Sequence, residues 1–577
     1  MDYIVSTLLK NNKIIGLVYL FVLLSSCGTD IKPKQANEVK PNIIFILTDD
    51  QRWDAFGYAG NELAYTPQMD KLAKQGVYFK NAISTTPICS ASRASIFSGL
   101  YERTHGYSFT SGDIKNEFMK NAFPRRLKES GYYTGFYGKF GVKYKGLDSL
   151  YHKSENYDLR YDRKDITSYY YKTIGKDTVH LTRYTGEKGL NFIKEAPIDK
   201  PFCLQLSFSA PHASDNTKEQ YFWQEENNSV LKNTVIPAAN ISSDEHYNKL
   251  PSIVKNGFNR SRWFWRYDTP EKYQRNIKGY YRMLAGVDNE IGKIRAELEK
   301  KGIADNTIII LMGDNGFFLG ERQITGKWLM YENSIKVPLV VYDPRNKEHK
   351  DIDEVALNID ISSTILDYAK IDAPKTWHGK SLLPLIEAKE LNTKERDTIL
   401  IEHIWDFDRI AASEGVRTKN WKYFRYVNDK SIEELYHLKN DPKEVNNLSN
   451  NPEYKSVLNA LRKKCNSLIN KYDDPTSLKP EKMVLKPNKN PQFNWVCNNT
   501  SSHQTAYQIL VSSTKENCIN NIGDLWDSHK TISDNYQDIG YSGKNLISNN
   551  DYFWKLRVWD DLNRPGMYSD PIRFKIQ

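Results

Sequence analysis

Apolar runs alternate with helical patterns over the first several hundred residues of the chain. Residues 42–48, 202–209 and 307–312 are mainly apolar runs that each end in polar residues, which is typical of buried parallel strands. Between them, residues 279–298 carry apolar side chains at helical spacing. This order of strand, helix and strand predicts an α/β domain built on one large sheet. The polar residues after the three runs should converge at the carboxyl ends of the strands, where such sheets bind ligands.

The pattern changes at about residue 397, which bounds the large domain at 41–396. Short β-like runs at 415–427 and 435–438 precede a helical stretch at 453–472, so we expect a small α+β subdomain over 397–472. Residues 473–491 contain four prolines among lysines and asparagines, which is a linker composition. Alternating runs separated by turn residues then predict a β-sandwich over 492–577.

The N-terminus has the pattern of an export signal. Lys10 and Lys13 precede the mainly apolar residues 14–24, a run that is too short to span a bilayer. The following Leu-Ser-Ser-Cys-Gly at 24–28 resembles the bacterial lipobox, which implies cleavage before Cys27 and lipidation of its sulfur. We therefore expect a lipoprotein signal peptide at 1–26, a linker at 27–40 and a lipid-anchored, exported outer-membrane protein that faces the cell surface or the periplasm. The alternative is a buried N-terminal helix.

Net charge and cysteine content indicate which partners and which metal or disulfide sites to expect. The 81 basic and 71 acidic residues give a net charge of +10, but both signs are interspersed, so we expect a mixed solvated surface and no nucleic-acid partner. A positive balance would also attract an anionic polysaccharide. Cys203, Cys465, Cys497 and Cys518 show no tight spacing that predicts a metal cluster or disulfide framework, although a Cys497–Cys518 bridge stays open.

Two groups of residues carry candidate chemistry. Cys89 opens the sequence Cys-Ser-Ala-Ser-Arg and precedes a predicted short helix at 94–100, which would place it at a helix amino terminus, where anions and thiolates are favoured. The second group offers four oxygen ligands at two strand ends, which suits Ca²⁺ better than zinc. An isolated pair of this kind is more often a turn or helix cap. Its members are Asp49, Asp50, Asp314 and Asn315.

The sequence at 89–93 resembles the signature of type I sulfatases, which belong to the alkaline-phosphatase-like superfamily. The likeness continues through 98–101 and 104–106 and covers roughly residues 41–470. It implies a large mixed sheet flanked by helices and a smaller α+β subdomain, to which this chain appends the β-sandwich predicted from its strand pattern. It also implies that a formylglycine-generating maturation enzyme oxidises Cys89. The hydrated aldehyde would attack the sulfur of a sulfate ester through one hydroxyl, and the other would then expel sulfate.

The same resemblance assigns roles to the remaining candidates. Arg93, Lys139 and Lys327 would hold the nucleophile and the sulfate oxygens, and His212 would protonate the leaving oxygen. The substrate would contact Lys139, His212 and Lys327. The Ca²⁺ ligands would be Asp49, Asp50, Asp314, Asn315 and the modified Cys89.

One position departs from the family. Where the family usually has Lys-Trp-His, this chain has Lys139-Phe140-Gly141, so the histidine that deprotonates the sulfated hydroxyl intermediate is missing. Two explanations stay open: His105 substitutes for it, or the subgroup turns over differently.

The last hundred residues resemble the N-terminal β-sandwich of bacterial α-L-rhamnosidases, at 504–509, 524–528 and 554–560. This implies a sulfated rhamnose in an ulvan-type polysaccharide as substrate, and a fusion in which a rhamnosidase catalytic domain follows Gln577 is one interpretation. A fibronectin-like spacer is the alternative.

The sequence leaves three alternatives to an ulvan-type sulfatase. A phosphoesterase of the same superfamily would usually add histidine ligands, whereas Asn315 follows Asp314 here. A sulfatase for another sulfated glycan and a non-catalytic surface glycan-binding protein are further alternatives. Candidates for lining a sugar subsite are Trp53, Arg260, Trp263 and Trp265.

Overall fold

The computed structural model describes residues 40–109, 111–157, 169–215, 217–388, 396–405, 409–473, 478–488, 490–498, 503–560, 565–566 and 568–576. The chain divides into two units, Met1–Lys40 and Pro41–Gln577, and the second contains the folded domains. The predicted signal peptide, its Cys27 and nearly all of the linker 27–40 lie outside the described residues. In the part of the chain that is described, no helix is both long enough and apolar enough to cross a membrane.

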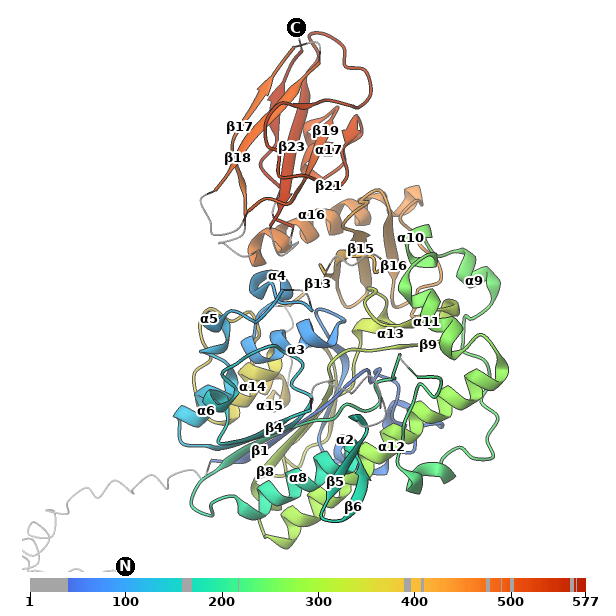
Figure 1. Cartoon of the computed structure of the whole chain (residues 1–577), viewed down its shortest axis with the longest axis vertical. Coiled ribbons are helices and arrows are strands. Elements are labelled where there is room, and N and C mark those ends of the chain that lie inside the picture. Colours follow the sequence, from blue (N-terminus) through green and yellow to red (C-terminus); the bar gives the residue numbers. More distant parts are fainter. Residues whose placement is uncertain are drawn as a thin grey trace, which may run out of the picture. The chain divides into compact units, whose positions relative to one another are not determined.

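The central sheet has the strand order β12-β2-β11-β8-β1-β7-β3-β4. Its strands β1, β4 and β8 are labelled in Figure 1. β11 runs antiparallel to β8 and β2, and the other neighbouring strands run parallel, so the sheet is mixed, as the resemblance implied. Its strands are β1 (Asn42–Thr48), β2 (Val77–Ile83), β3 (Tyr133–Gly138), β4 (Lys153–Asn156), β7 (Phe202–Ser207), β8 (Thr307–Gly313), β11 (Leu339–Tyr342) and β12 (Lys350–Leu357).

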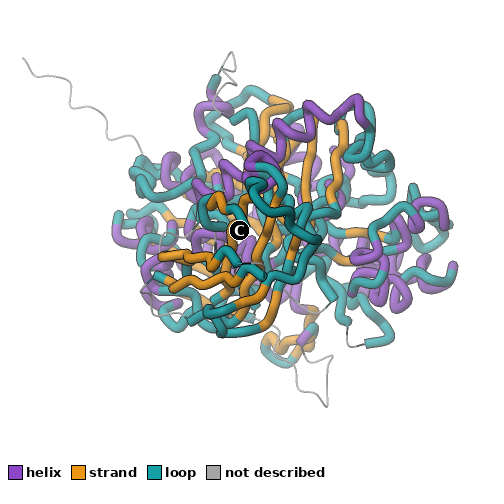
Figure 2. Tube along the Cα trace, turned by 90° about the horizontal axis from the view of Figure 1, so that it is seen from above, coloured by secondary structure: helices purple, strands orange, loops and turns teal. Residues whose placement is uncertain are grey.

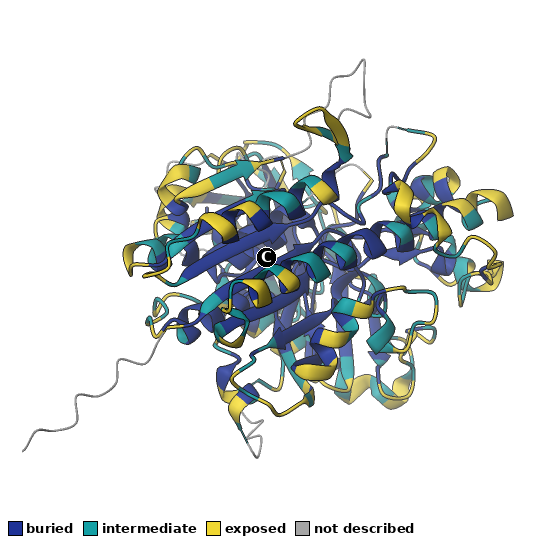
Figure 3. Ribbon diagram, turned by 90° about the horizontal axis from the view of Figure 1, so that it is seen from below, coloured by how far each residue is buried: buried dark blue, intermediate teal, exposed yellow. Residues whose placement is uncertain are grey.

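Both faces of this sheet are covered, because successive side chains of β1 enter different cores. Ile43, Phe45 and Leu47 pack in one cluster and Ile44 and Ile46 in the other, as the alternation of a strand requires. The sheet is buried along its strands, while the flanking helices expose one side (Figure 3). Two-sided burial explains the continuous apolar run. The first face is covered by α3 (Cys89–Ser98), α6 (Phe123–Glu129) and α14 (Asp360–Tyr368), and the second by α2 (Pro67–Gln75), α8 (Leu181–Glu195) and α12 (Pro270–Lys300).

The predicted helix 279–298 lies inside α12, which begins earlier, at Pro270. Thr269 caps it, since its hydroxyl accepts a hydrogen bond from the amide of Lys272. Shorter elements connect the large ones: α4 (Glu102–His105), α5 (Asn116–Met119), α7 (Leu147–Leu150), β5 (Tyr171–Ile174), β6 (Asp177–His180), α9 (Asp244–Asn248), α10 (Ser252–Lys255), α11 (Phe258–Arg266), β9 (Phe318–Leu319), β10 (Thr325–Gly326), α13 (Glu332–Ile335) and α15 (Leu383–Glu387).

A smaller antiparallel sheet follows the large domain. Its order is β13-β14-β15-β16, and α16 packs on it through Leu458, Leu461 and Cys465. This is the α+β arrangement predicted from the pattern after residue 397. The elements are β13 (Ile399–His403), β14 (Ser413–Arg417), β15 (Trp421–Tyr426), β16 (Glu433–His437) and α16 (Lys455–Tyr472).

The C-terminal region is a β-sandwich built almost entirely of strands and loops (Figures 1 and 2). β17 (Pro480–Lys486) pairs with β18 (Gln492–Cys497), so the segment 473–491, predicted as a linker, contributes a strand. Cys497 and Cys518 are free thiols, and the bridge left open by the sequence does not form between them. The remaining elements are β19 (Ala506–Ser512), α17 (Lys515–Ile519), β20 (Trp526–Asp527), β21 (Thr531–Ile532), β22 (Ile539–Gly540), β23 (Tyr552–Trp559) and β24 (Ile572–Phe574).

Candidate active site

Cys89 is the first residue of α3, which starts earlier than the predicted helix 94–100. The whole helix is buried, and Ile88 before it provides no capping side chain, so the amino end of α3 favours an anion at residue 89. Ser92 fixes the helix in place, because its hydroxyl donates to the main-chain oxygen of Asp314 over 2.6 Å. The same hydroxyl accepts from Asn358 Nδ2 at 3.0 Å.

The predicted oxygen ligands meet at the ends of two adjacent strands. β1 and β8 pair in parallel with Thr48 opposite Gly313, so the residues that follow them lie side by side. The amide of Asp50 donates to Asp314 Oδ1 over 3.1 Å, and Asn315 Nδ2 donates to Asp50 Oδ1 over 2.7 Å. The expectation that these polar residues converge is met.

Asp50 is held in an unusual backbone conformation. Its φ is +66°, in the left-handed region that Asp tolerates better than most residues. The hydroxyl of Tyr280, from α12, donates to the main-chain oxygen of Asp50 over 2.9 Å. Because Tyr280 lies 230 positions away, the sequence carries no signal for this contact.

Three basic side chains surround these carboxylates. Arg93 Nε donates to Asp314 Oδ2 over 2.9 Å, Lys139 is paired with Asp49, and Lys327 with Asp50. Cys89 is close enough to all three that its charge contributes to raising the pKa of each basic group. Burial is the largest influence on Asp49 and opposes its ionisation, but the charges of Lys139 and the other basic neighbours together outweigh burial and hold the pKa of that carboxyl below its ordinary value.

Asp314 behaves differently from Asp49. Burial, and then the charge of Asp49, raise the pKa of Asp314 to about 6. Because the carboxylates of Asp49 and Asp314 repel each other, a further positive charge beside them would be stabilising.

His212 lies at the rim of this group, in the loop after β7. Its Nε2 is 3.7 Å from Asp50 Oδ2, and its side chain is 16% exposed while the carboxylates are fully enclosed. Burial lowers the pKa of His212 to about 4. The structure therefore brings the nine predicted site residues together, and we call them the active-site cluster: Asp49, Asp50, Cys89, Arg93, Lys139, His212, Asp314, Asn315 and Lys327.

The oxygen atoms of the cluster fit a hard divalent cation. Among the described residues, Asp49 Oδ1, Asp50 Oδ2 and Asn315 Oδ1 are buried without a hydrogen-bond partner. Ligand atoms of Asp49, Asp50 and His212 lie within 4.8 Å of one another. Buried oxygens that nothing satisfies are costly, and a cation would satisfy them.

The departure at Gly141 has a structural reason. Its φ is +74°, and a Cβ added there would lie 2.6 Å from Cδ of Arg93. A histidine at this position would therefore collide with Arg93. His105 is engaged elsewhere: its Nε2 contacts Ser95 Oγ at 2.9 Å, and its Nδ1 accepts from the amide of Tyr107 at 3.0 Å. Neither bond reaches the active-site cluster.

The aromatic candidates separate into different places. Trp265 packs against Phe258, which in turn contacts Trp328, the neighbour of Lys327. Arg260 instead stacks on Trp263, with its guanidinium carbon 4.1 Å from the ring centroid. Trp53 contacts Lys336 and lines a separate pocket. Of the four, Trp265 is thus linked through Phe258 and Trp328 to the chain beside Lys327, while Trp53 lies three residues after Asp50.

α11 supports the cluster through residues that no motif in the sequence marks. Asn259 Nδ2 donates to the main-chain oxygen of Lys327 over 3.0 Å. Arg262 and Arg266 both pair with Asp215, which lies three residues after His212. This one helix therefore braces two segments that carry cluster residues.

Family models match most of the described chain. The Sulfatase model matches residues 41–371, the model described as N-sulphoglucosamine sulphohydrolase, C-terminal, matches 320–471, and the Rha78A-like, N-terminal immunoglobulin domain matches 481–576. The last match confirms the likeness of the sandwich to the N-terminal domain of rhamnosidases.

Characterised relatives point the same way. An arylsulfatase of Clostridium perfringens is 30% identical over 74% of this chain and 93% of its own length. An N-acetylglucosamine-6-O-sulfatase of Bacteroides thetaiotaomicron is 26% identical over 84% and 95%, and an ulvan-active sulfatase of Formosa agariphila is 27% identical over 84% and 93%.

Solved structures share the fold. BT4656 in complex with its substrate D-glucosamine-2-N,6-O-disulfate has a TM-score of 0.62 at 23% identity, covering 76% of this chain and 99% of its own. The phosphonate monoester hydrolase of Agrobacterium radiobacter has a TM-score of 0.61 at 21% identity, covering 75% and 96%. Together with the cluster geometry and a family match over more than half of its length, these findings show that the chain belongs to the sulfatase family of sulfuric ester hydrolases.

Proposed function

We propose that this sulfatase removes sulfate from rhamnose in an ulvan-type polysaccharide, with residue 89 as a formylglycine nucleophile and Ca²⁺ as electrophile. The observation that carries the catalytic part is the set of buried, unsatisfied oxygens of Asp49, Asp50 and Asn315 beside the start of α3. The substrate part is supported by the rhamnosidase-like sandwich and by the ulvan-active relatives.

Formylglycine would supply paired hydroxyls, one to attack sulfur and one to release the sulfate. Residue 89 suits this role because it opens a helix and lies within the influence of three cations. Arg93 also donates to the main-chain oxygen of Lys139, so the guanidinium is fixed from two sides.

A calcium ion would supply positive charge to the nucleophile and to the sulfate oxygens. Asp49, Asp50, Asp314 and Asn315, together with residue 89, would hold it, and no histidine is needed among these oxygen donors. With a divalent cation, the three carboxylates and three basic side chains leave a surplus of positive charge, which favours an anionic ester.

The chain's own side chains then divide the remaining work. Lys139 and Lys327 neutralise charge on the ester as the bond to sulfur changes. His212 is more exposed to solvent than the carboxylates, and we assign it the protonation of the leaving sugar oxygen. Because burial lowers its pKa in the free protein, bound substrate must favour the protonated imidazole. These assignments are the ones that the resemblance to type I sulfatases implies, and the convergence of the side chains in the active-site cluster supports them.

We further propose that the protein is exported and anchored through lipid on Cys27, and that a maturation enzyme modifies Cys89. Anchoring at the outer membrane would place the enzyme where polysaccharide fragments arrive. Metabolic labelling with palmitate, comparing the wild type with Cys27→Ala, tests the anchor.

The substrate proposal is tested by sulfate release, measured by ion chromatography, from ulvan, glycosaminoglycan, carrageenan and fucoidan oligosaccharides. Ulvan fragments should be preferred, and sulfate but no rhamnose should be released by the chain. The Bacteroides relative makes a glycosaminoglycan-type sulfate the main competitor. Preference for any of the other three glycans, with ulvan fragments inert, would reject the substrate while leaving the sulfatase assignment intact.

A further inference from the structure

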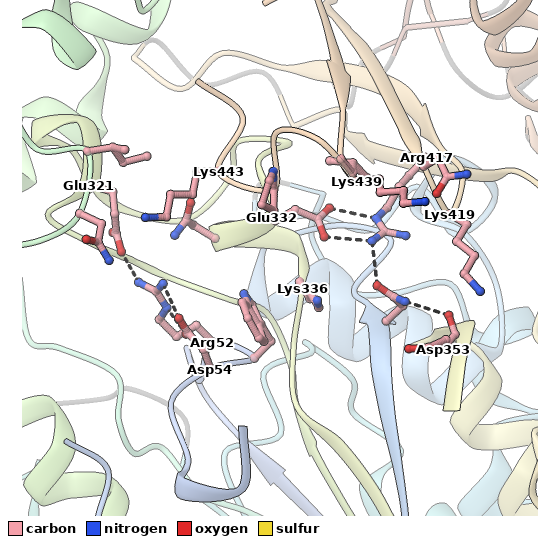
Figure 4. A pocket seen from close by; sticks show the side chains of 18 residues that line it. Arg52, Asp54, Glu321, Glu332, Lys336, Asp353, Arg417, Lys419, Lys439 and Lys443 are labelled. Carbon is pink, nitrogen blue, oxygen red and sulfur yellow. Dashed lines mark hydrogen bonds and ion pairs between the residues drawn. The ribbon is translucent and has the colours of Figure 1, made fainter. Parts of the chain in front are cut away.

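A pocket of about 680 Å³ is lined by none of the active-site cluster residues (Figure 4). Its walls come from the loop after β1, from α13, and from the turns of the small sheet. We call it the basic pocket after its six basic side chains: Arg52, Lys336, Arg417, Lys419, Lys439 and Lys443.

The acidic side chains of the basic pocket are engaged with cations. Asp54 and Glu321 both pair with Arg52, at 2.8 and 2.5 Å. Glu332 pairs with Arg417 at 2.9 Å (Figure 4). These ion pairs hold Arg52 and Arg417 in place and neutralise Asp54, Glu321 and Glu332.

The lysines of the basic pocket are not neutralised in the same way. Lys419, Lys439 and Lys443 are exposed, and within the described residues they form no ion pair or side-chain hydrogen bond. Asp353, the remaining acid of the wall, lies 3.6 Å from Lys80 instead. A concave surface with surplus charge of one sign concentrates its field, so this pocket attracts anions.

Other lining groups are suited to a saccharide. Trp53 is half-buried, and Lys336 holds its ammonium 4.1 Å from the ring centroid. Asn240, Asn333 and Asn420 also line the wall, and their amides can both donate to and accept from hydroxyls. An aromatic ring with a few convergent polar groups is the usual composition of a small-ligand site.

We propose that the basic pocket is a second binding site, which takes a sulfated saccharide segment distinct from the one at the active-site cluster. The proposal rests on the proposed function for the nature of the glycan. Trp53 stands three residues after Asp50, so these two backbone positions are at most about 11 Å apart. The segment that carries the candidate metal ligand Asp50 therefore also supplies Trp53 to the pocket wall. The lysines of the basic pocket lie on other segments.

Lysine acylation mapped by mass spectrometry locates the site. The full chain carrying Cys89→Ala is treated with an amine-reactive ester, alone and with sulfated dextran oligosaccharide, neutral dextran or polyphosphate. Sulfated dextran should slow acylation of Lys419, Lys439 and Lys443 severalfold, while the exposed Lys71 and Lys300 react as before. Equal protection of pocket and distant lysines, or equal protection by neutral dextran or polyphosphate, would overturn the proposal.

A matched pair of variants measures the affinity. Lys419→Ala/Lys439→Ala and Lys71→Ala/Lys300→Ala remove the same number of exposed charges, so general attraction falls equally in both. In the Cys89→Ala background, the pocket variant should bind sulfated dextran about tenfold more weakly than the control by calorimetry. Equal affinities would reject the site.

Sulfate release from the unmutated chain is measured separately. If that activity fails while the lysine protection persists, the proposed function falls and the binding site stands. If the activity is present and the protection absent, only the second site is rejected.

Discussion

Arg93 occupies the space that a side chain at residue 141 would need. The guanidinium bridges Asp314 and the main chain of Lys139, so it ties the end of β8 to the segment after β3. Glycine at 141 leaves room for this bridge, whereas the histidine expected from the resemblance would crowd Arg93.

Restoring the family histidine should therefore impair the enzyme. Gly141→His places a Cβ at positive φ and 2.6 Å from Arg93, which must move. We expect kcat for sulfate release to fall about tenfold or more, and the free energy of unfolding to fall by roughly 1–3 kcal/mol. Urea denaturation and steady-state kinetics measure both. An equal or faster variant would show that Arg93 tolerates the displacement and that the missing histidine is the real deficit.

Removal of the metal should affect stability as well as turnover. The oxygens of Asp49, Asp50 and Asn315 lose their proposed partner on chelation, so Tm should fall with activity, and Ca²⁺ should restore both. Differential scanning fluorimetry and sulfate release follow the two effects. Full activity after chelation, or recovery with zinc alone, would contradict the ligand assignment.

The residues of the cluster could be predicted because each stands in a motif or at the end of an apolar run. Asp49 and Asp314 follow buried strands, and Cys89 opens the sulfatase signature. Tyr280 and Asn358 could not be predicted in the same way. They act on main-chain atoms of residues more than 200 positions away, and nothing in their local sequence marks such contacts.

At the scale of elements, α11 contacts both the segment that carries Lys327 and the loop that carries His212. Asn259 near its start holds the main chain of Lys327, and Arg262 and Arg266 near its end hold Asp215. Asp215 in turn belongs to the loop that carries His212. The helix thus acts as a positioning element, since its side chains touch neighbours of the cluster rather than the reacting atoms.

Asp215→Ala should loosen this brace. The two buried arginines lose a shared carboxylate, so we expect unfolding free energy to fall by roughly 3 kcal/mol and kcat to fall with it. Asp215→Glu should recover part of kcat if the charge is what matters. The control is Asp268→Ala, which removes an exposed pair with Lys272 and should change both quantities much less. Similar effects of the two alanine variants would remove α11 from the account.

Element boundaries were predicted less well than element types. The sequence indicated a linker at 473–491 because of its prolines, but β17 starts at Pro480 and pairs with β18. Proline fits the first residue of a strand, so composition alone could not separate the two cases. Likewise, the apolar pattern predicted a helix only over 279–298, whereas α12 begins at Pro270 after the Thr269 cap. The first turns of the helix do not share that apolar pattern, so the pattern could not locate its start.

At the scale of the whole chain, the sandwich is joined to the small sheet by a buried arginine. Arg557 of β23 donates to the main-chain oxygen of Val427 over 2.7 Å and to Gln508 over 3.0 Å. Asn521 Nδ2 adds a contact of 3.1 Å to Asn466 of α16. These bonds give the two domains a specific junction.

Arg557→Ala should uncouple them. It leaves the carbonyl of Val427 without its partner, so we expect the unfolding free energy to fall by about 2–3 kcal/mol or the single transition to separate into two. Arg573→Ala, which removes an exposed arginine of the neighbouring β24, is the matched control and should change the transition much less. Calorimetry distinguishes the cases. One unchanged transition in both variants would show that the junction contributes little.

The proposed mechanism depends on the chemistry of residue 89. The most direct test is peptide mass spectrometry of that residue in protein whose sulfate release has been measured, with Cys89→Ala as the inactive reference. We predict that the active fraction carries formylglycine and that activity rises in proportion to it. Active protein with only an unmodified thiol at Cys89, or substantial sulfate release by Cys89→Ala, would contradict the mechanism.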